Sequence, residues 1–162
     1  MFKSIFWITK PVIKKIEKYL KKKLQIYSSV YFTIFKNDSN SPLWNISEWK
    51  DCTESPDTDI CEELEQFINK NNLVYKNILS AGKIPQIIEE IKKKNIQEIH
   101  LCGFDTDSCV LATAYALFDL GIKPVVIENL TWSTSKEKLH QPAIKMLQRN
   151  IGFVEKVWIL LK

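Results

Sequence analysis

Glycine is scarce in this sequence, and long apolar runs are missing from it. Only 4 of the 162 residues are glycine. No stretch approaches the roughly 18 consecutive apolar residues that a membrane-spanning helix needs. The apolar start, MFKSIFWIT, is too short for the hydrophobic part of a signal peptide and has no small-residue cleavage site. We therefore expect a cytoplasmic protein with no membrane partner.

Side chains that bind transition metals are also few. The sequence has 2 histidines and 4 cysteines, which are His100, His140, Cys52, Cys61, Cys102 and Cys109. Their spacing contains no CxxC pair and no zinc pattern of cysteine and histidine. We expect the cysteines to be free thiols, and we expect no metal and no cofactor.

Charge gives little reason to expect nucleic acid. The net charge is +4, and much of it comes from lysines in the segments 10–23 and 92–94. A nucleic-acid-binding face would more often combine arginine with aromatic residues. In Pro11–Leu24 the apolar residues have the spacing of one buried helix stripe, with Pro11 in the first turn. A membrane-surface helix is the alternative, but the apolar face is narrow and no acylation motif is present.

Strand-like and helix-like segments alternate along the chain. Strands are expected at Gln25–Phe35, Asn72–Lys76, Glu98–Gly103, Pro124–Glu128 and Lys156–Leu161. Helices are expected at Pro11–Leu24, Glu62–Asn69, Ile84–Lys94, Cys109–Leu120 and Lys136–Asn150, and a long loop at Lys36–Pro56. This order predicts one α/β domain over residues 1–162, a three-layer Rossmann-like sandwich with a mostly parallel sheet and helices on both faces.

The motif GFDTDSCV, residues 103–110, places a cysteine where a strand passes into a helix. Ser108 or Asp107 could cap the helix that starts near Cys109. A helix N-terminus stabilises a thiolate and can hold an oxyanion, and Lys76 ends a strand at the same edge of the sheet. Neither histidine is an obvious base for Cys109, so a carboxylate is the more natural one. The alternative is that Cys109 is a small, half-buried structural residue.

The C-terminal third resembles the isochorismatase-like cysteine hydrolases. The matching residues are Gly103, Thr106, Cys109, Val110, Glu128, Ser133 or Ser135, and His140. Upstream, VYKNILSAG resembles the strand-terminal lysine of that family and a serine after it, here Lys76 and Ser80. The resemblance runs from about Pro11 to the C-terminus.

The resemblance implies a hydrolase for a small amide or a related C–N or ether substrate. Its triad is aspartate, lysine and cysteine, in which Cys109 would be the nucleophile and Lys76 the lysine. A cis peptide bond would join Phe104 and Asp105, and backbone N–H groups near Asp105 and Cys109 would form the oxyanion hole. The family commonly forms oligomers, so we expect a homo-oligomer.

The sequence departs from the family at the aspartate. That residue ends the first strand of the family, and by spacing it would fall at or upstream of Met1, whereas the first aspartate here is Asp38. We therefore expect the first central strand to be truncated or missing, unless SIFWIT replaces it without the acid. Asp105 and Asp107 do not occupy the position of the base. A catalytically dead member that acts as a binding or oligomerisation subunit is the alternative function.

Two further expectations concern the substrate pocket. In this family, nicotinamidases bind zinc through an Asp-x-His-x-His type of cluster after the second strand, and the corresponding segment, FKNDSNSPLW, has no histidine. The resemblance therefore implies a metal-free enzyme and disfavours nicotinamidase activity. Trp44 and Ser80 are weak candidates for pocket residues, and the tryptophan could equally cap the core.

Overall fold

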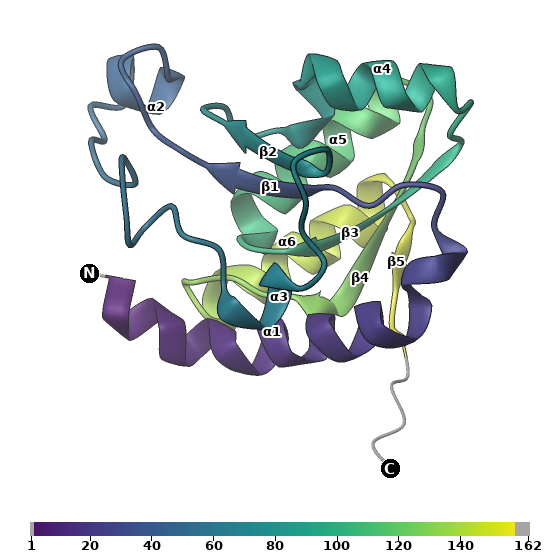
Figure 1. Ribbon diagram of the computed structural model, residues 1–162, viewed down its shortest axis with the longest axis horizontal. Coiled ribbons are helices and arrows are strands. Elements are labelled where there is room, and N and C mark those ends of the chain that lie inside the picture. The colour runs from purple at the N-terminus through teal and green to yellow at the C-terminus, as the bar shows by residue number, and fades with distance from the viewer. Residues whose placement is uncertain (1, 158–162) are drawn as a thin grey trace.

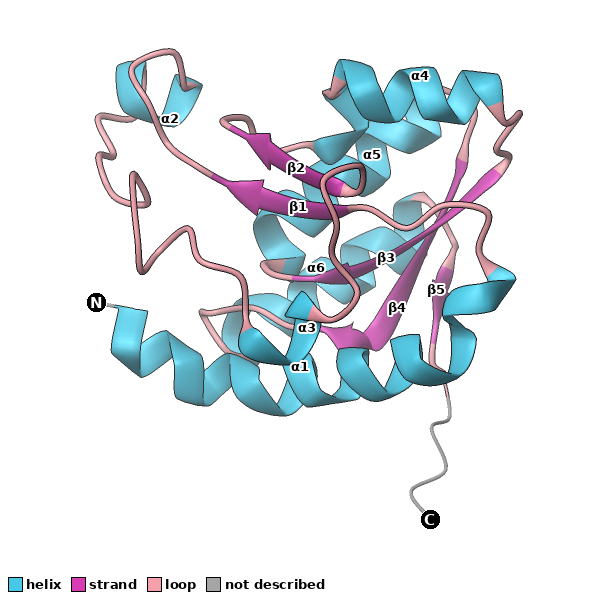
Figure 2. Cartoon of the chain, viewed as in Figure 1, coloured by secondary structure: helices cyan, strands magenta, loops and turns pink. Residues whose placement is uncertain are grey.

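The parallel strands form two separate sheets in the part of the chain that the structure describes. This part is residues 2–157 of a computed structural model, with the side chains described from residue 9 onward. One sheet pairs β1 (Phe32–Phe35) with β2 (Leu73–Lys76), and the other has the order β3 (Glu98–Gly103), β4 (Lys123–Thr131), β5 (Val154–Glu155). All pairs are parallel, and the two sheets lie side by side in Figure 2.

Helices cover both faces of the second sheet, as Figure 1 shows. On one face α1 (Phe2–Lys23) packs its buried stripe, which includes Val12 and Ile16, against Ile127 of β4. On the other face, residues of α5 (Leu111–Asp119) and α6 (Glu137–Asn150) pack against Val126. Because Val126 and Ile127 are consecutive strand residues, their side chains point to opposite faces. The predicted three-layer α/β sandwich is therefore confirmed.

The shorter elements surround this frame. Helix α4 (Pro85–Lys93) follows the predicted Ile84–Lys94 closely, and β3 has the predicted limits Glu98–Gly103. The predicted long loop contains the short helix α2 (Pro42–Asn45), and α3 (Glu62–Glu65) is shorter than expected. Three helical turns complete the description: η1 (Leu24–Ile26), η2 (Ala81–Lys83) and η3 (Thr106–Val110).

The predicted start of the first helix is wrong. Helix α1 begins at Phe2, so Pro11 lies inside it and SIFWIT is helical rather than a strand. The φ angle of proline suits a helix, and the buried residues Val12, Ile13 and Ile16 anchor the helix on the sheet just beyond Pro11. No described helix is both long and apolar enough to cross a membrane.

Two predicted strands are shorter than expected. Of the predicted strand at residues 25–35, only β1 (Phe32–Phe35) pairs, because the neighbouring strand β2 offers only four residues. Near the C-terminus, β5 covers Val154–Glu155, and Lys156 and Val157 lie beyond it. Residues 158–161 of the predicted last strand lie outside the described residues.

Candidate active site

Lys76 and Cys109 meet at the carboxyl ends of the strands. The ammonium Nζ of Lys76 lies 3.3 Å from Sγ of Cys109 and donates to the carbonyl oxygens of Ile78 and Leu79, each at 2.9 Å. Lys76 ends β2, and Cys109 lies in the helical turn that follows β3. The sequence predicted both residues for the site, and the fold brings them together.

The surroundings of Lys76 favour a negatively charged partner. Its side chain is buried, and the ring of Phe35 lies 5.2 Å from Nζ. Among the described residues no carboxylate forms an ion pair or a hydrogen bond with Lys76. A buried charge is costly unless it is compensated, and the thiolate of Cys109 is the nearest group able to compensate it. The geometry therefore places a buried cation directly beside the sulfur of Cys109.

The turn before Cys109 has the expected cis peptide bond between Phe104 and Asp105. The predicted caps are wrong: the helical segment starts at Thr106, its N-cap is Asp105, and no side chain caps it. The carboxylate of Asp105 instead accepts from the backbone N and the Oγ1 of Thr134, at 2.7 and 2.8 Å. Burial raises the pKa of Asp105, and the two bonds from Thr134 oppose that rise. Through these two hydrogen bonds Asp105 connects the turn before Cys109 to the loop after β4.

His140 supports the same turn from α6. Its Nδ1 lies 2.9 Å from Oγ1 of Thr106, and both residues are buried. The ring of Trp132 packs at 4.6 Å between centroids. Burial lowers the pKa of His140 below its ordinary value of 6.5 and so favours the neutral imidazole, while nearby carboxylates such as Glu128 oppose that shift. We read His140 as a support for the turn, since its contact is with Thr106 and not with Cys109.

Replacing His140 with alanine should lower the free energy of unfolding by about 2–4 kcal/mol, from a lost hydrogen bond and lost packing. Because the folded state keeps His140 neutral, the unfolded state binds more protons below pH 6.5, and stability should fall as the pH drops below that value. Urea unfolding at about pH 8 and about pH 5 measures both effects. In His140→Ala the free energy of unfolding should depend less on pH than in the wild type. His140→Asn should be more stable than His140→Ala, because asparagine keeps a polar group that can bond Thr106. An unchanged pH dependence would contradict the assignment.

Thr113 connects the two halves of the site. Its Oγ1 donates to the carbonyl of Cys109 at 2.6 Å and accepts from the backbone N of Ala81 at 2.9 Å. Ala81 begins η2, just after the carbonyls that hold Lys76. The sequence prediction missed Thr113, although its position four residues after Cys109 places it on the same side of the helix.

A valine at position 113 keeps the shape of threonine but removes the hydroxyl. The backbone N–H of Ala81 would lose its acceptor, so we expect a loss of about 1–3 kcal/mol in stability. The loop that holds Lys76 would also loosen, so alkylation of Cys109 should slow. Thermal unfolding and alkylation rates of Thr113→Val and Thr113→Ser test this, since the serine keeps the hydroxyl. Equal Cys109 rates in wild type and both variants would show that Thr113 does not position the pair.

A cavity of about 260 Å³ adjoins the pair, and both Lys76 and Cys109 line it. Neither of the weak pocket candidates does. Trp44 lies in α2 with the ammonium of Lys50 at 4.3 Å from its ring, and Ser80 caps η2 by accepting from the backbone N of Gly82. A role for either in binding substrate stays a prediction.

The other thiols lie in less reactive surroundings. Burial raises the pKa of Cys52 to about 11, and it also raises the pKa of Cys61, whereas Cys102 is exposed. All the cysteines are free. In the described part of the chain no three histidine, cysteine or acidic side chains lie together as a metal-binding group. Cys109 is thus the thiol that has a cation beside it.

Comparisons with known proteins identify the family and the fold of the chain. The sequence model of the Isochorismatase domain matches residues 8–156. An isochorismatase-like hydrolase from Alkaliphilus metalliredigens is 16% identical, with a TM-score of 0.73 over 91% of this chain and 81% of that one. The N-carbamoylsarcosine amidase from Thermoplasma acidophilum is 15% identical, with a TM-score of 0.75 over 93% and 85%.

A pyrazinamidase/nicotinamidase from Streptococcus mutans is 21% identical and has a TM-score of 0.75, covering 89% of this chain and 84% of that one. At these identities the structures support the fold. None of the curated proteins compared matches the sequence. The match of the family model spans most of the chain, and the chain belongs to the Isochorismatase domain family.

Proposed function

We propose that the chain is a metal-independent cysteine hydrolase for a small amide or a related C–N or ether substrate, with Cys109 as the nucleophile. The contact of 3.3 Å between Lys76 and Cys109 is the observation that carries the proposal. The adjoining cavity of about 260 Å³ has room for a small ligand and is lined by both residues. The family supplies hydrolase chemistry, and this geometry supplies the residues.

The steps for an amide follow from the two side chains. The thiolate of Cys109 attacks the carbonyl carbon, the C=O π electrons move to oxygen, and a tetrahedral oxyanion forms. Backbone N–H groups at the start of the helical turn stabilise that oxyanion, as the resemblance implies. The oxyanion collapses, the C–N bond breaks, and the ammonium of Lys76 can give its proton to the departing nitrogen. Water then attacks the thioester and gives a proton to the neutral amine of Lys76. The C–S bond breaks, which releases the acid and restores the thiolate of Cys109 and the ammonium of Lys76.

One observation favours a second candidate function, that of a binding subunit without catalytic activity. The described residues bring no carboxylate to Lys76 or Cys109, whereas the family resemblance implies an aspartate base there. A chain that binds a ligand or a partner without turnover would need no such base. The catalytically inactive binding subunit is therefore the alternative.

Release of ammonia from a panel of small primary amides distinguishes the cysteine hydrolase from the inactive binding subunit. If the chain hydrolyses them, at least one amide should release ammonia, and Cys109→Ser should reduce that release to the uncatalysed rate. The serine keeps a similar shape but is a far weaker nucleophile at neutral pH. Release that persists in Cys109→Ser would contradict the role of Cys109. Binding of an amide without release in the wild type would favour the inactive subunit.

A further inference from the structure

Cys52 lies in the loop that passes the end of the sheets where Lys76 and Cys109 meet. This loop, residues 46–61, joins α2 to α3, and Figure 1 shows it on the side of the molecule to which the arrowheads of β1 and β2 point. Cys52 and Cys109 are both free thiols of intermediate exposure. The proposed hydrolysis uses only Cys109, so Cys52 is a sulfur nucleophile without an assigned role.

Asn37 holds the backbone around Cys52 in place. Its backbone N donates to the carbonyl oxygen of Cys52 at 2.8 Å, and its buried side-chain amide donates to the carbonyl oxygens of Trp49 and Asp51 at 2.8 and 3.1 Å. Cys52 has a φ of 59°, in the left-handed region that residues other than glycine rarely adopt. Three hydrogen bonds from one buried residue therefore set the path of the loop at Cys52.

Two further sets of contacts connect this part of the loop to Lys76. The backbone N of Lys36, the residue before this asparagine, donates to the carbonyl oxygen of Lys76 at 2.8 Å. The ring of Trp49 packs at 6.0 Å between centroids against the ring of Phe35, and that second ring lies 5.2 Å from Nζ of Lys76. Because the same Nζ lies 3.3 Å from Sγ of Cys109, the loop packs at the place where the nucleophile lies.

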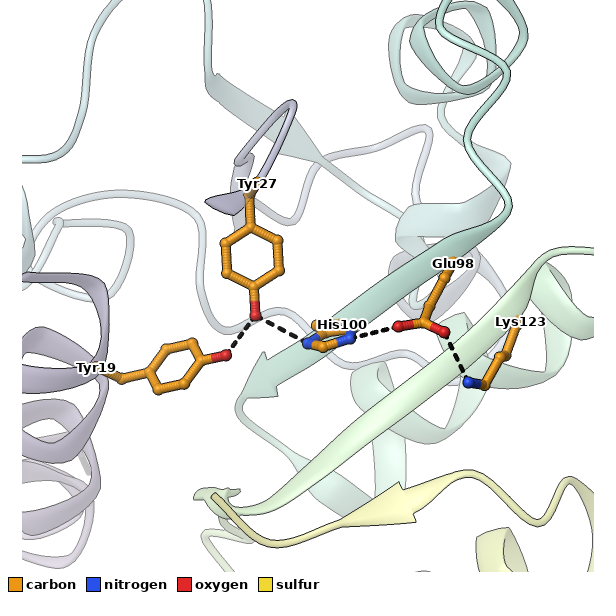
Figure 3. Close-up of polar contacts among 5 residues, drawn as sticks. All are labelled: Tyr19, Tyr27, Glu98, His100 and Lys123. Carbon is orange, nitrogen blue, oxygen red and sulfur yellow. Dashed lines mark hydrogen bonds and ion pairs between the residues drawn. The ribbon is translucent and has the colours of Figure 1, made fainter. Parts of the chain in front are cut away.

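The opposite end of β1 is fixed as well. The hydroxyl of Tyr27, which precedes this strand, lies 2.8 Å from Nδ1 of His100 in β3 and also contacts the hydroxyl of Tyr19, as Figure 3 shows. Nε2 of His100 lies 2.8 Å from the carboxylate of Glu98, which accepts from Lys123 at 2.6 Å. Strands β1 and β3 do not pair within the described residues, so these contacts help to set the position of β1 relative to β3.

The two thiols differ in their electrostatic surroundings. Burial, two aspartates of the same loop and the charge of Cys109 together raise the pKa of Cys52 to about 11. A charge on Cys109 is therefore close enough to disfavour a second negative charge on Cys52. The ammonium of Lys76 lies beside Cys109, whereas Cys52 stays protonated at neutral pH. These surroundings suit one sulfur that reacts first and a second that reacts with the product.

We propose that Cys109 and Cys52 form a redox-active pair, in which a peroxide oxidises Cys109 and Cys52 then closes a disulfide that reversibly blocks the nucleophile. Cys109 lines the cavity and is therefore open to a molecule as small as a peroxide. Cys52 lies in a loop, which adjusts more easily than a strand or helix to the geometry of a disulfide. The proposal needs a reactive sulfur at Cys109 and does not depend on the hydrolysis of amides.

The reaction balances with hydrogen peroxide as the oxidant. The thiolate of Cys109 attacks one oxygen, the O–O bond breaks, and the departing hydroxide takes up the proton that Cys109 lost and becomes water. Cys109 is then a sulfenic acid. The sulfur of Cys52 attacks the sulfur of Cys109, the S–O bond breaks, and the departing hydroxide leaves as water with the thiol proton of Cys52. A dithiol reductant restores both thiols by exchange.

Mass spectrometry of the full chain after treatment with hydrogen peroxide tests the pair. The wild type should lose two hydrogen atoms, and digestion without reductant should give a linked peptide that joins Cys52 to Cys109. Iodoacetamide should no longer label Cys109 in the oxidised chain. Dithiothreitol should restore both the original mass and the labelling.

Cys52→Ser and Cys61→Ser are matched variants, because both residues are half-buried free thiols that precede α3. Without Cys52 the sulfenic acid has no partner, so dimedone should label Cys109 about tenfold more than in the wild type. Cys61→Ser should form the disulfide at the rate of the wild type. Lys76→Met should form it about tenfold more slowly, because the thiolate that attacks the peroxide loses its charged neighbour.

Three results would overturn the proposal. They are a folded wild type in which Cys109 does not react with peroxide, oxidation of Cys109 to the sulfinic acid without a disulfide, and a disulfide that joins Cys109 to Cys61 or Cys102. The disulfide is detected by mass, and the hydrolase is detected by release of ammonia. A chain that forms no disulfide can therefore still prove to be a hydrolase, and a chain that releases no ammonia can still form the disulfide.

Discussion

Replacing Lys76 with methionine should slow the alkylation of Cys109 by iodoacetamide about 10- to 100-fold at neutral pH, because the thiolate loses a charged hydrogen bond worth about 1.5–3 kcal/mol. Methionine keeps most of the buried stem of lysine but carries no charge. The contact of 3.3 Å between Nζ and Sγ is what the substitution removes. Rates for each cysteine come from quantitative mass spectrometry of peptides after timed exposure to the reagent.

The other cysteines serve as internal controls for this experiment. Cys52 has a pKa raised to about 11, so in the wild type it should react more slowly than Cys109. The rate of Cys61, whose pKa is raised by burial and by the nearby charge of Glu63, should be the same in Lys76→Met. Thermal unfolding of the variant shows whether it is folded. If Cys109 of the wild type reacts no faster than Cys52, or if Lys76→Met leaves its rate unchanged, the pair does not activate the thiol.

Leu130→Ala should lower the free energy of unfolding by about 2–5 kcal/mol, the range for removing a fully buried leucine side chain. Leu130 is 0% exposed and belongs to the cluster through which α1, with Val12 and Ile16, packs against β4. The packed sheet cannot close completely over the space left by three carbon atoms. Chemical denaturation of wild type and variant gives the difference.

Leu120→Ala is the matched control for that measurement. Leu120 is 53% exposed at the end of α5, so the same substitution should change the stability by no more than about 0.5 kcal/mol. Similar losses in the two variants would show that α1 does not bury Leu130 as described.

Part of the fold could be predicted because the signals were local. The apolar run before Gly103 fixed both ends of β3, and the isoleucine spacing gave α4 to within one residue at each end. The start of α1 could not be read the same way, since Pro11 is a common first residue of helices and here lies within one. The pairing of β1 begins only at Phe32 because β2 is short, and β2 is distant from β1 in the sequence.

The site shows the same division. Lys76 ends one strand and Cys109 lies in the turn after another, and parallel strands share a carboxyl edge, so the contact between them could be expected. The partners of Asp105 and of His140 could not, because they depend on how the loop after β4 and helix α6 pack on the turn. The expectation of a truncated or missing first central strand came from the family resemblance, and the strands of the described residues form two separate sheets. The contact between Tyr27 and His100 could not be predicted, because the two residues are distant in the sequence and only the fold brings them together.

Acylation of the protein by p-nitrophenyl acetate tests the central claim most directly. Attack by Cys109 would release p-nitrophenolate in a rapid first phase and leave one acetyl group on the sulfur as a thioester. We predict a burst close to one equivalent per chain, acetyl on Cys109 by mass spectrometry, a much slower burst in Lys76→Met and none in Cys109→Ser. Absence of a burst in the folded wild type, or an acetyl group on another residue with Cys109 unmodified, would contradict Cys109 as the nucleophile.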